Sequence, residues 1–371
     1  MKHWLLATTM AAALSATAAA QPAPAPTPTL TRVAGFDQQV TGVAATRDGR
    51  VFVNFPRWEK DVPVSVGEVM KDGSVRPYPD EGWNSYRNGH EVSVGDHFVC
   101  VQSVVVDPTG AALWVVDPAA PGNEFIKPGG PKLVKIDLAT NKVVQVVRFD
   151  TTLVPQGSYI NDVRFTPDAR WAFLTDSGQR GALLVVDTAT GKARRVLDGD
   201  KRTQVQPGVV PTADGHELRR PDNRIPSFAA DGLATSPDGR YVYWQDLVGT
   251  KLYRVPVTSL TNAALPPARL AAAVEEVATT HVADGLWMDR AGFLFITDPA
   301  NNSVDMRAPG GQTTTVAKDD RLRWPDSMAE AADGSIYVTA SHIQDMAMFH
   351  DKGSTQQGPW ELFRIEQPHG K

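Results

Sequence analysis

The sequence predicts an all-β protein, a six-bladed β-propeller, from two observations. A short pattern of strand, tight turn and second strand recurs along the chain, with its clearest copy at Asp231 to Trp244. Further segments of alternating polarity lie between the copies, which is typical of half-buried strands. Each unit then holds about four antiparallel strands over roughly 40 to 70 residues, the size of a propeller blade.

The recurring hairpin occurs six times. Its turn often contains an Asp-Gly pair between runs of β-branched and aromatic residues, and glycine accepts the positive φ that such a turn needs. The copies run from Thr41 to Val53, from Gln102 to Val115, from Asn161 to Leu174, from Asp231 to Trp244, from Asp284 to Ile296 and from Asp326 to Val338.

Residues 1–20 have the pattern of a signal peptide. Lys2 and His3 precede an apolar run from Trp4 to Ala16, and the segment ends in three alanines, which is too short and wrongly flanked for a membrane-spanning helix. We therefore expect cleavage after Ala20 and a secreted or periplasmic protein. Residues 21–29 are rich in Pro, Ala and Thr and are expected to form a tether outside the fold.

The N-terminal strand is expected to complete the last blade. Leu30 to Phe36 has the pattern of an outermost strand but no blade of its own, whereas the last hairpin is followed by one further strand only, Trp360 to Ile365. Pairing the two closes the ring and covers their exposed edges. Residues 30–366 would then form the propeller and residues 367–371 a tail.

Three long loops and one short helix are expected between the strands. The loops span residues 79–96, 200–227 and 341–359, and loops of such length in a compact domain are usually functional or disordered. The helix is predicted over residues 266–277, where Leu270, Val274 and Val277 have helical spacing.

Composition argues against several classes of partner. The net charge is −5 and no block of Lys or Arg occurs, which disfavours nucleic acid. No apolar segment after the first twenty residues has membrane length. Cys100 is the single cysteine and lies in an apolar run, so we expect a buried, inert thiol and no intrachain disulfide. The expected protein is a monomer with a small-molecule ligand.

Candidate ligand-binding residues come from one column of the aligned units. The first residue of each hairpin is polar in all six, and equivalent positions of the innermost strands should face the central axis at one height. The column is Thr41, Gln102, Asn161, Asp231, Asp284 and Asp326.

Converging carboxylates repel one another unless some are protonated or a cation lies among them. The oxygen ligands Asn161, Asp231, Asp284 and Asp326 suit Ca²⁺ or Mg²⁺, and an organic ammonium would satisfy the same charge. Alternatively, these Asp residues cap the loops that lead into the inner strands.

The loops between second and third strands should reach the same mouth. Asp117, Asp176, Asp246 and Asp298 follow second strands there and fit turn chemistry. Other residues break this pattern and are better candidates for ligand contacts: Arg57, Trp58 and His342. His281 is expected on the rim, and Tyr159 and Trp324 either wall the pocket or pack between blades.

The chain resembles the bacterial branch of the yellow and major royal jelly protein family. The resemblance rests on residues 51–58, Cys100 to Val104, Leu113 to Asp117, Pro131 to Leu138, Tyr159 to Val163 and Ala230 to Leu233. It implies a secreted six-bladed propeller. Some relatives bind small amines in the central pocket and others are linked to dopachrome conversion, without a shared catalytic motif.

A more distant resemblance is to the gluconolactonase and senescence-marker propellers, whose divalent metal is held by Glu, Asn and Asp. Asn161 and Asp231 or Asp284 occupy comparable positions, but Thr41 stands where these proteins have the Glu.

Two functional hypotheses follow. The first is a propeller that binds a small ligand, cationic or bridged by a metal, at the channel mouth. The alternative is a hydrolase or isomerase that depends on a divalent metal, lactonase-like or dopachrome-converting, with His342 or His281 carrying a proton. The sequence leaves open whether the protein is an enzyme.

Overall fold

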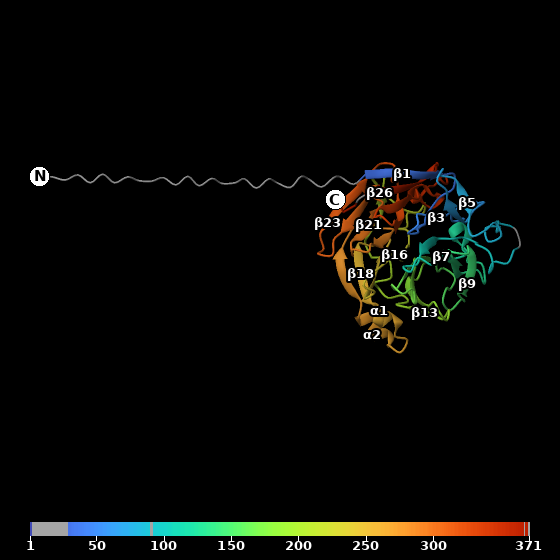
Figure 1. Cartoon of the computed structure of the whole chain (residues 1–371), viewed down its shortest axis with the longest axis horizontal. Coiled ribbons are helices and arrows are strands. Elements are labelled where there is room, and N and C mark those ends of the chain that lie inside the picture. Colours follow the sequence, from blue (N-terminus) through green and yellow to red (C-terminus); the bar gives the residue numbers. More distant parts are fainter. Residues whose placement is uncertain (2–28, 90–91, 367, 370–371) are drawn as a thin grey trace.

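Six four-stranded antiparallel sheets follow one another around a ring, as the sequence predicts (Figure 1). The computed structural model describes Met1 and residues 29–89, 92–366 and 368–369. Residues 2–28, which hold most of the expected signal peptide and tether, lie outside the described residues, as does part of the expected tail. No helix among the described residues is long and apolar enough to cross a bilayer.

The strands of blades one to five run in chain order from the axis outward, and in blade six the outermost strand is the N-terminal one. Blades one to three are formed by β2 (Val43–Ala45), β3 (Val51–Asn54), β4 (Val66–Val69) and β5 (Val75–Pro77); by β6 (Ser103–Val106), β7 (Ala112–Asp117), β8 (Lys132–Asp137) and β9 (Lys142–Arg148); and by β10 (Ile160–Phe165), β11 (Trp171–Asp176), β12 (Ala182–Asp187) and β13 (Ala193–Val196).

Blades four to six are formed by β16 (Ala230–Thr235), β17 (Tyr241–Asp246), β18 (Lys251–Pro256) and β19 (Glu275–Thr279); by β20 (Leu286–Met288), β21 (Leu294–Asp298), β22 (Ser303–Arg307) and β23 (Thr313–Lys318); and by β24 (Pro325–Glu330), β25 (Ile336–Ala340), β26 (Trp360–Glu366) and β1 (Thr29–Phe36).

Shorter elements lie in the connections. They are the two-stranded sheet of β14 (Thr212–Ala213) and β15 (His216–Glu217), the α-helices α1 (Val257–Thr261) and α2 (Pro267–Ala272), and the 3₁₀ turns η1 (Pro121–Asn123), η2 (Ile343–Asp345) and η3 (Ala347–Phe349).

The N-terminal strand closes the ring, which confirms the expected pairing. β1 lies antiparallel to β26, with Leu30 opposite Ile365 and Phe36 opposite Trp360. The register shifts between Arg32 and Ala34, as a β-bulge would produce. Both edges are thereby paired, and the first and last described strands belong to one sheet.

Buried polar side chains tie neighbouring blades together. Asn54, Thr175, Gln245 and Thr339 lie at or next to the end of a second strand, and each is 0% exposed. Each donates to a backbone carbonyl just before or at the start of the next inner strand: Asn54 to Val101 (3.0 Å), Thr175 to Asp231 (2.7 Å), Gln245 to His281 (2.7 Å) and Thr339 to Thr41 (2.6 Å). These bonds fix where the inner strands begin.

The helix predicted over residues 266–277 is only half correct. Helix α2 ends at Ala272, and Glu275–Thr279 form β19, the outermost strand of blade four. Pairing with β18 satisfies the backbone groups of this segment, so the tertiary context overrides the helical spacing of Val274 and Val277.

We expect the closing strand to contribute strongly to stability through its buried end. Phe36 is 5% exposed and packs edge-on against Phe55, with ring centroids 5.3 Å apart. Phe36→Ala should lower the free energy of unfolding by about 3 kcal/mol. Val33→Ala, an exposed position on the same strand, should change it by less than about 0.5 kcal/mol. Urea unfolding of both variants checks this, and equal effects would contradict a packed closure.

Candidate functional site

A cavity of about 810 Å³ occupies the mouth of the ring where the inner strands begin, here called the upper mouth. Four members of the predicted polar column line this upper cavity: Gln102, Asn161, Asp231 and Asp284. Its wall also includes Trp58 and Tyr159. The structure therefore brings together residues that lie far apart in the sequence, as expected for a radial arrangement.

Two members of the column do not line the upper cavity. Thr41 is 0% exposed and donates its hydroxyl to the carbonyl of Gln102 (3.0 Å). Asp326 accepts hydrogen bonds from Ser327 and Ser341, both at 2.9 Å. These two residues serve local structure through hydroxyl hydrogen bonds, not through the loop caps that the sequence left open for the Asp residues.

Irregular pairing at the start of the inner strands directs the polar residues toward the axis. The register between β10 and β11 shifts between Ile160 and Val163, so Asn161 and Asp162 together oppose one residue of the neighbouring strand. Similar shifts occur around Asp231 and Asp326. A bulge turns a side chain out of the regular alternation, and Asp162 joins the acidic group in this way. The sequence signal for Asp162 is its charge, because the second residue of the other five hairpins is Gly or Ser.

Asp231 and Asp284 form the acidic floor of the upper cavity. Asp284 Oδ2 accepts the indole N–H of Trp324 at 2.5 Å. The Asp231 carboxylate accepts no hydrogen bond from the described residues. Because Asp231 is only 4% exposed, its charge has lost most of its hydration without gaining a protein partner.

Burial and mutual repulsion raise the pKa values of these acids. Desolvation raises the pKa of Asp284 to about 7, and the charge of Asp162 adds to the shift. The pKa of Asp231 lies well above its ordinary value, first through burial and then through Asp284, Asp162 and Asp326. Burial likewise raises the pKa of Asp326. A cation in the cavity would favour the ionised forms of Asp231 and Asp284.

A directional chain of hydrogen bonds orients the wall opposite the acids. Trp58 Nε1 donates to the Tyr159 hydroxyl (2.7 Å), which donates to Gln102 Oε1 (3.0 Å). Gln102 Nε2 then donates to Asn161 Oδ1 (3.1 Å), and Asn161 Nδ2 donates to Ser177 Oγ (3.0 Å). The chain fixes the rotamers of the aromatic pair before any ligand arrives.

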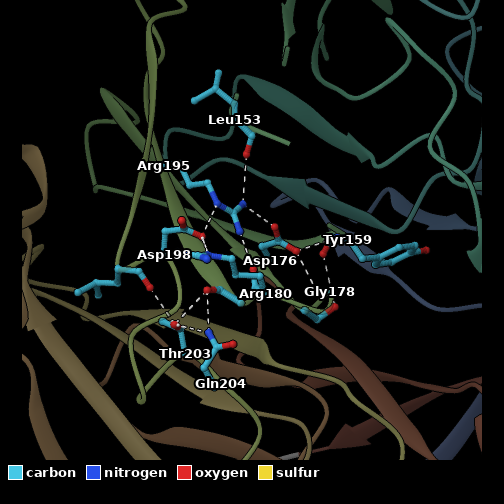
Figure 2. Close-up of polar contacts among 12 residues, drawn as sticks. Leu153, Tyr159, Asp176, Gly178, Arg180, Arg195, Asp198, Thr203 and Gln204 are labelled. Atoms are coloured by element: carbon cyan, nitrogen blue, oxygen red, sulfur yellow. Dashed lines mark hydrogen bonds and ion pairs between the residues drawn. The ribbon is translucent and has the colours of Figure 1, made fainter. Parts of the chain in front are cut away.

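Figure 2 shows how a buried ion pair positions Tyr159. Asp176, at the end of β11, accepts the backbone N–H groups of Tyr159 (2.7 Å) and Gly178 (2.9 Å). Its second oxygen pairs with Arg195 at 2.6 Å, and Arg195 also contacts Asp198 at 2.9 Å. The carboxylate of Asp176 thus has the turn role that the sequence favoured, one step behind the cavity wall.

Two of the three long loops border the upper cavity, the first through Arg220 and Ser227 and the second mainly through apolar side chains. Phe228 follows the loop at residues 200–227, and Ile343, Met346 and Met348 come from the loop at residues 341–359. Arg323 joins the two loops, because it pairs with Asp214 (2.5 Å) and with Asp345 (2.8 Å). The sequence offered no signal for this clamp, since its members come from three separate segments.

Arg57 does not reach the upper cavity, contrary to its selection as a ligand contact. The side chain is 1% exposed and pairs with Asp61 at 2.8 Å. Its remaining donors are taken by Ser65 Oγ and by the backbone carbonyls of Val62, Tyr86, Phe98 and Val99. Arg57 therefore anchors Tyr86 in the loop at residues 79–96, and no described residue of that loop lines the cavity.

Neither candidate histidine lines the upper cavity. His281 Nδ1 contacts the carbonyl of Val282 (2.9 Å), and its Nε2 lies 3.3 Å from Asp305. His342 is 7% exposed, and burial lowers its pKa. Both of its ring nitrogens are buried without a hydrogen-bond partner among the described residues. In this geometry, neither ring is in place to move a proton within the cavity.

The oxygen donors of the upper cavity fit a divalent metal incompletely. Among the described residues, no group of three or more His, Cys, Asp or Glu side chains is placed to hold an ion. Asn161 Oδ1 already accepts from Gln102, and Asp326 lies behind the wall. Ca²⁺ ordinarily takes six to eight oxygen ligands, whereas only two carboxylates of the predicted metal set, Asp231 and Asp284, line this cavity.

Comparisons with known proteins place this geometry among propellers. A family model described as major royal jelly protein matches residues 99–357. A search of curated proteins found no match. Solved structures with similar folds include a gluconolactonase from Xanthomonas campestris (12% identity, 91% of this chain and 89% of that chain, TM-score 0.54).

Two further structures are similar over nearly their whole length. One is a luciferin-regenerating enzyme (11% identity, 91% of this chain and 95% of that chain, TM-score 0.54) and the other a streptogramin B lyase (12% identity, 92% and 98%, TM-score 0.51). Identities this low establish a shared fold and carry no activity across.

The raised pKa of Asp284 predicts a stability that falls as pH rises. Its pKa is about 7 in the folded chain against 3.8 ordinarily, so between these values the folded state holds a proton that the unfolded state lacks. The resulting stabilisation is present at low pH and is lost as pH rises through about 7. Asp284→Asn cannot lose this proton, so its stability relative to wild type should rise by about 2 kcal/mol between pH 5.5 and pH 8, most of it below pH 7.

Urea unfolding at both pH values checks this expectation. Asp72→Asn is a matched control, because hydrogen bonds from Ser74 lower the pKa of this exposed acid. Asp72 is then ionised in both states throughout the window, and its variant should shift stability equally at the two pH values. An Asp284→Asn effect that does not depend on pH would contradict the proton-linked account.

Proposed function

The chain belongs to the major royal jelly protein family, and on that premise we propose that it binds a small organic cation in the upper cavity. The ligand is an ammonium group carried on an apolar or aromatic body. Asp231 and Asp284 contact the ammonium, and the aromatic and methionine side chains of the wall enclose the body.

The unpartnered carboxylate of Asp231 carries this proposal. It lines a cavity, it is nearly buried, and no described residue donates a hydrogen bond to it. Placing an ammonium there supplies both the charge and the donors that the site lacks. Asp284, held by Trp324, provides a second oxygen whose direction is fixed in advance.

The remaining wall suits an organic body rather than a bare ion. Trp58 and Tyr159 lie with ring centroids 6.5 Å apart, and Phe228 and Met348 also line the cavity. Aromatic faces attract cations, and methionine adapts to irregular apolar shapes. A volume of about 810 Å³ also exceeds what one metal ion needs.

A metal-dependent hydrolase or isomerase is the weaker candidate. Asn161, Asp231 and Asp284 would be the available ligands, and a bound divalent ion would polarise a carbonyl or activate water. However, the amide oxygen of Asn161 is already engaged, and neither His281 nor His342 lines the cavity. The donor set therefore favours an organic cation over Ca²⁺ or Mg²⁺.

Calorimetric titration with 2-phenylethylamine tests the proposal, because this probe combines an ammonium with an aromatic body. The wild-type protein should bind it more tightly than the neutral 2-phenylethanol. Asp231→Asn should weaken amine binding roughly 30-fold, since it removes a charge that contacts the ammonium in a desolvated site. Asp326→Asn is the matched control, because Asp326 is a buried acid of the same column that does not line the cavity.

The control variant should not weaken amine binding, because it removes a source of repulsion on Asp231 and no contact with the ammonium. Equal binding of amine and alcohol would reject a cation site. Tight binding of Ca²⁺ with no response to the amine would instead support the metal-dependent alternative.

Amine affinity should also depend on pH. Because the pKa of Asp284 is about 7 and that of Asp231 is also raised, binding the ammonium requires the loss of protons below neutral pH. We expect affinity to rise by about tenfold from pH 6 to pH 8, and Asp284→Asn to flatten this profile. Titrations in buffers with different ionisation enthalpies measure the proton release directly. A flat profile in the wild-type protein would contradict the role of these acids.

A further inference from the structure

We propose a second ligand site at the opposite, lower mouth of the channel, which takes a small organic carboxylate with an apolar body. This mouth is formed by the hairpins that join the first and second strands of each blade. It holds a separate cavity of about 410 Å³, which shares no lining residue with the upper one.

Every blade contributes to the lower cavity. The lining residues include Arg47, Pro108, Pro167, Pro237, Arg290 and Ala331, one from each successive hairpin. A cavity that collects the same turn from six repeats is a structural feature of the ring and not a gap beside a single loop.

Arg164 is the exceptional residue of the lower cavity. Its position in the aligned inner strands is apolar in the other blades, where Ala44, Val105, Ala234, Trp287 and Ala329 stand. The residue is 6% exposed, and its terminal nitrogens donate to the carbonyls of Val163 and Leu286, both at 2.8 Å. One of them also pairs with Asp162 at 3.3 Å. Its Nε has no acceptor among the described residues.

Trp287 supplies a second donor without an acceptor. The guanidinium carbon of Arg164 lies 5.1 Å from the centroid of the Trp287 ring, and both residues line the lower cavity. The indole Nε1 of Trp287 is buried and, within the described chain, unpaired. Leaving a buried donor unsatisfied costs about 1–3 kcal/mol, so an incoming acceptor would gain from this pair.

The acids at the lower mouth are already occupied. Asp107 accepts from Thr109 and Trp114, and Asp289 accepts from His369 and two backbone amides. Glu330 pairs with Arg290 at 2.7 Å. Arg47, in contrast, is exposed, forms no ion pair with a described residue and makes only a 3.5 Å contact with the carbonyl of Pro108. The groups without any partner are therefore donors, on Arg47, Arg164 and Trp287, and donors favour an anion.

The rest of the lining selects an organic anion over an inorganic one. Val105, Phe165 and Met288 line the cavity beside the Trp287 ring, and three prolines form part of its rim. A phosphate or sulfate ion would leave these apolar surfaces in water. A carboxylate on an aromatic or aliphatic body would cover them while its oxygens face the donors.

Isothermal titration of the full chain with 3-phenylpropionate tests the site. We expect binding that persists when 2-phenylethylamine saturates the upper cavity, because the two sites share no residue. The neutral 3-phenylpropionamide should bind at least about tenfold more weakly, since hydrogen bonds to a charged acceptor are the stronger ones. Acetate and inorganic phosphate should also bind more weakly, because they lack the apolar body.

Two variants locate the binding. Trp287→Phe keeps an aromatic ring but removes the indole donor, and it should weaken 3-phenylpropionate binding by about tenfold. Arg47→Gln removes an exposed charge at the rim and should weaken it by about threefold. Trp83→Phe and Lys142→Gln make the same chemical changes away from this mouth and should have no effect. Thermal unfolding confirms that each variant is folded.

Several outcomes would overturn this second site. One is equal binding of the acid and its amide, and another is competition between 3-phenylpropionate and the amine. No binding at millimolar concentration would also reject it. Loss of binding in Asp231→Asn but not in Trp287→Phe would place the carboxylate in the upper cavity instead. The amine site is tested separately, by the preference for 2-phenylethylamine over 2-phenylethanol and by the effect of Asp231→Asn on amine binding.

Discussion

The closed ring depends on buried hydrogen bonds that set the start of each inner strand relative to the preceding blade. Asn54, Thr175, Gln245 and Thr339 each donate to the neighbouring blade from a fully buried position, so losing a donor would leave a buried carbonyl unsatisfied. Close approach of the inner strands is part of the same constraint. A Cβ at Gly285 would lie 1.8 Å from the carbonyl oxygen of Asp326, so only glycine allows this contact. Because Thr175 holds the backbone of Asp231 itself, the interaction that assembles the blades also fixes the acidic floor.

The buried acids of the floor lower the stability of the fold when they are ionised, because they are desolvated and repel one another. Protonation relieves the repulsion, because Asp284 titrates near 7 and Asp231 and Asp326 titrate well above their ordinary pKa values. The buried indole of Trp324 donates a hydrogen bond to Asp284. The backbone of Trp324 is strained, since its φ of 51° is unusual for a bulky residue. A structural role alone would be served as well by Asn or Ser at these positions. Retaining carboxylates in a cavity is more readily explained by a positively charged ligand.

Residue patterns predicted the architecture and the identity of the acidic floor, because both follow from repetition. The hairpins are local, and aligning them places Asp231 and Asp284 together without further information. The predictions that failed concern residues whose hydrogen-bond partners come from other segments of the chain. The sequence favours Arg57 as a ligand contact because nothing in it shows that the carbonyls of Tyr86 and Phe98 fold back onto this side chain. Asp326 was grouped with the cavity residues because the hydroxyls that engage it are not visible in an alignment of repeats. Arg164 is not among the predicted site residues, although aligning the six repeats shows it as the one charged residue at an otherwise apolar position.

The channel is divided by charge as well as by geometry. Asp162 and Arg164 form a buried ion pair at 3.3 Å, with both side chains 7% exposed, between the acids of the upper cavity and the lower cavity that Arg164 lines. A buried pair contributes little net stability, because desolvation of both ions offsets their attraction. Its effect on the neighbouring groups is larger. Arg164 provides a cationic partner for Asp162, whereas Asp231, Asp284 and Asp326 form no ion pair with a described residue. Asp231 and Asp284 therefore have no cationic partner among the described residues. Arg164 Nε, on the side of the lower cavity, has no acceptor among them.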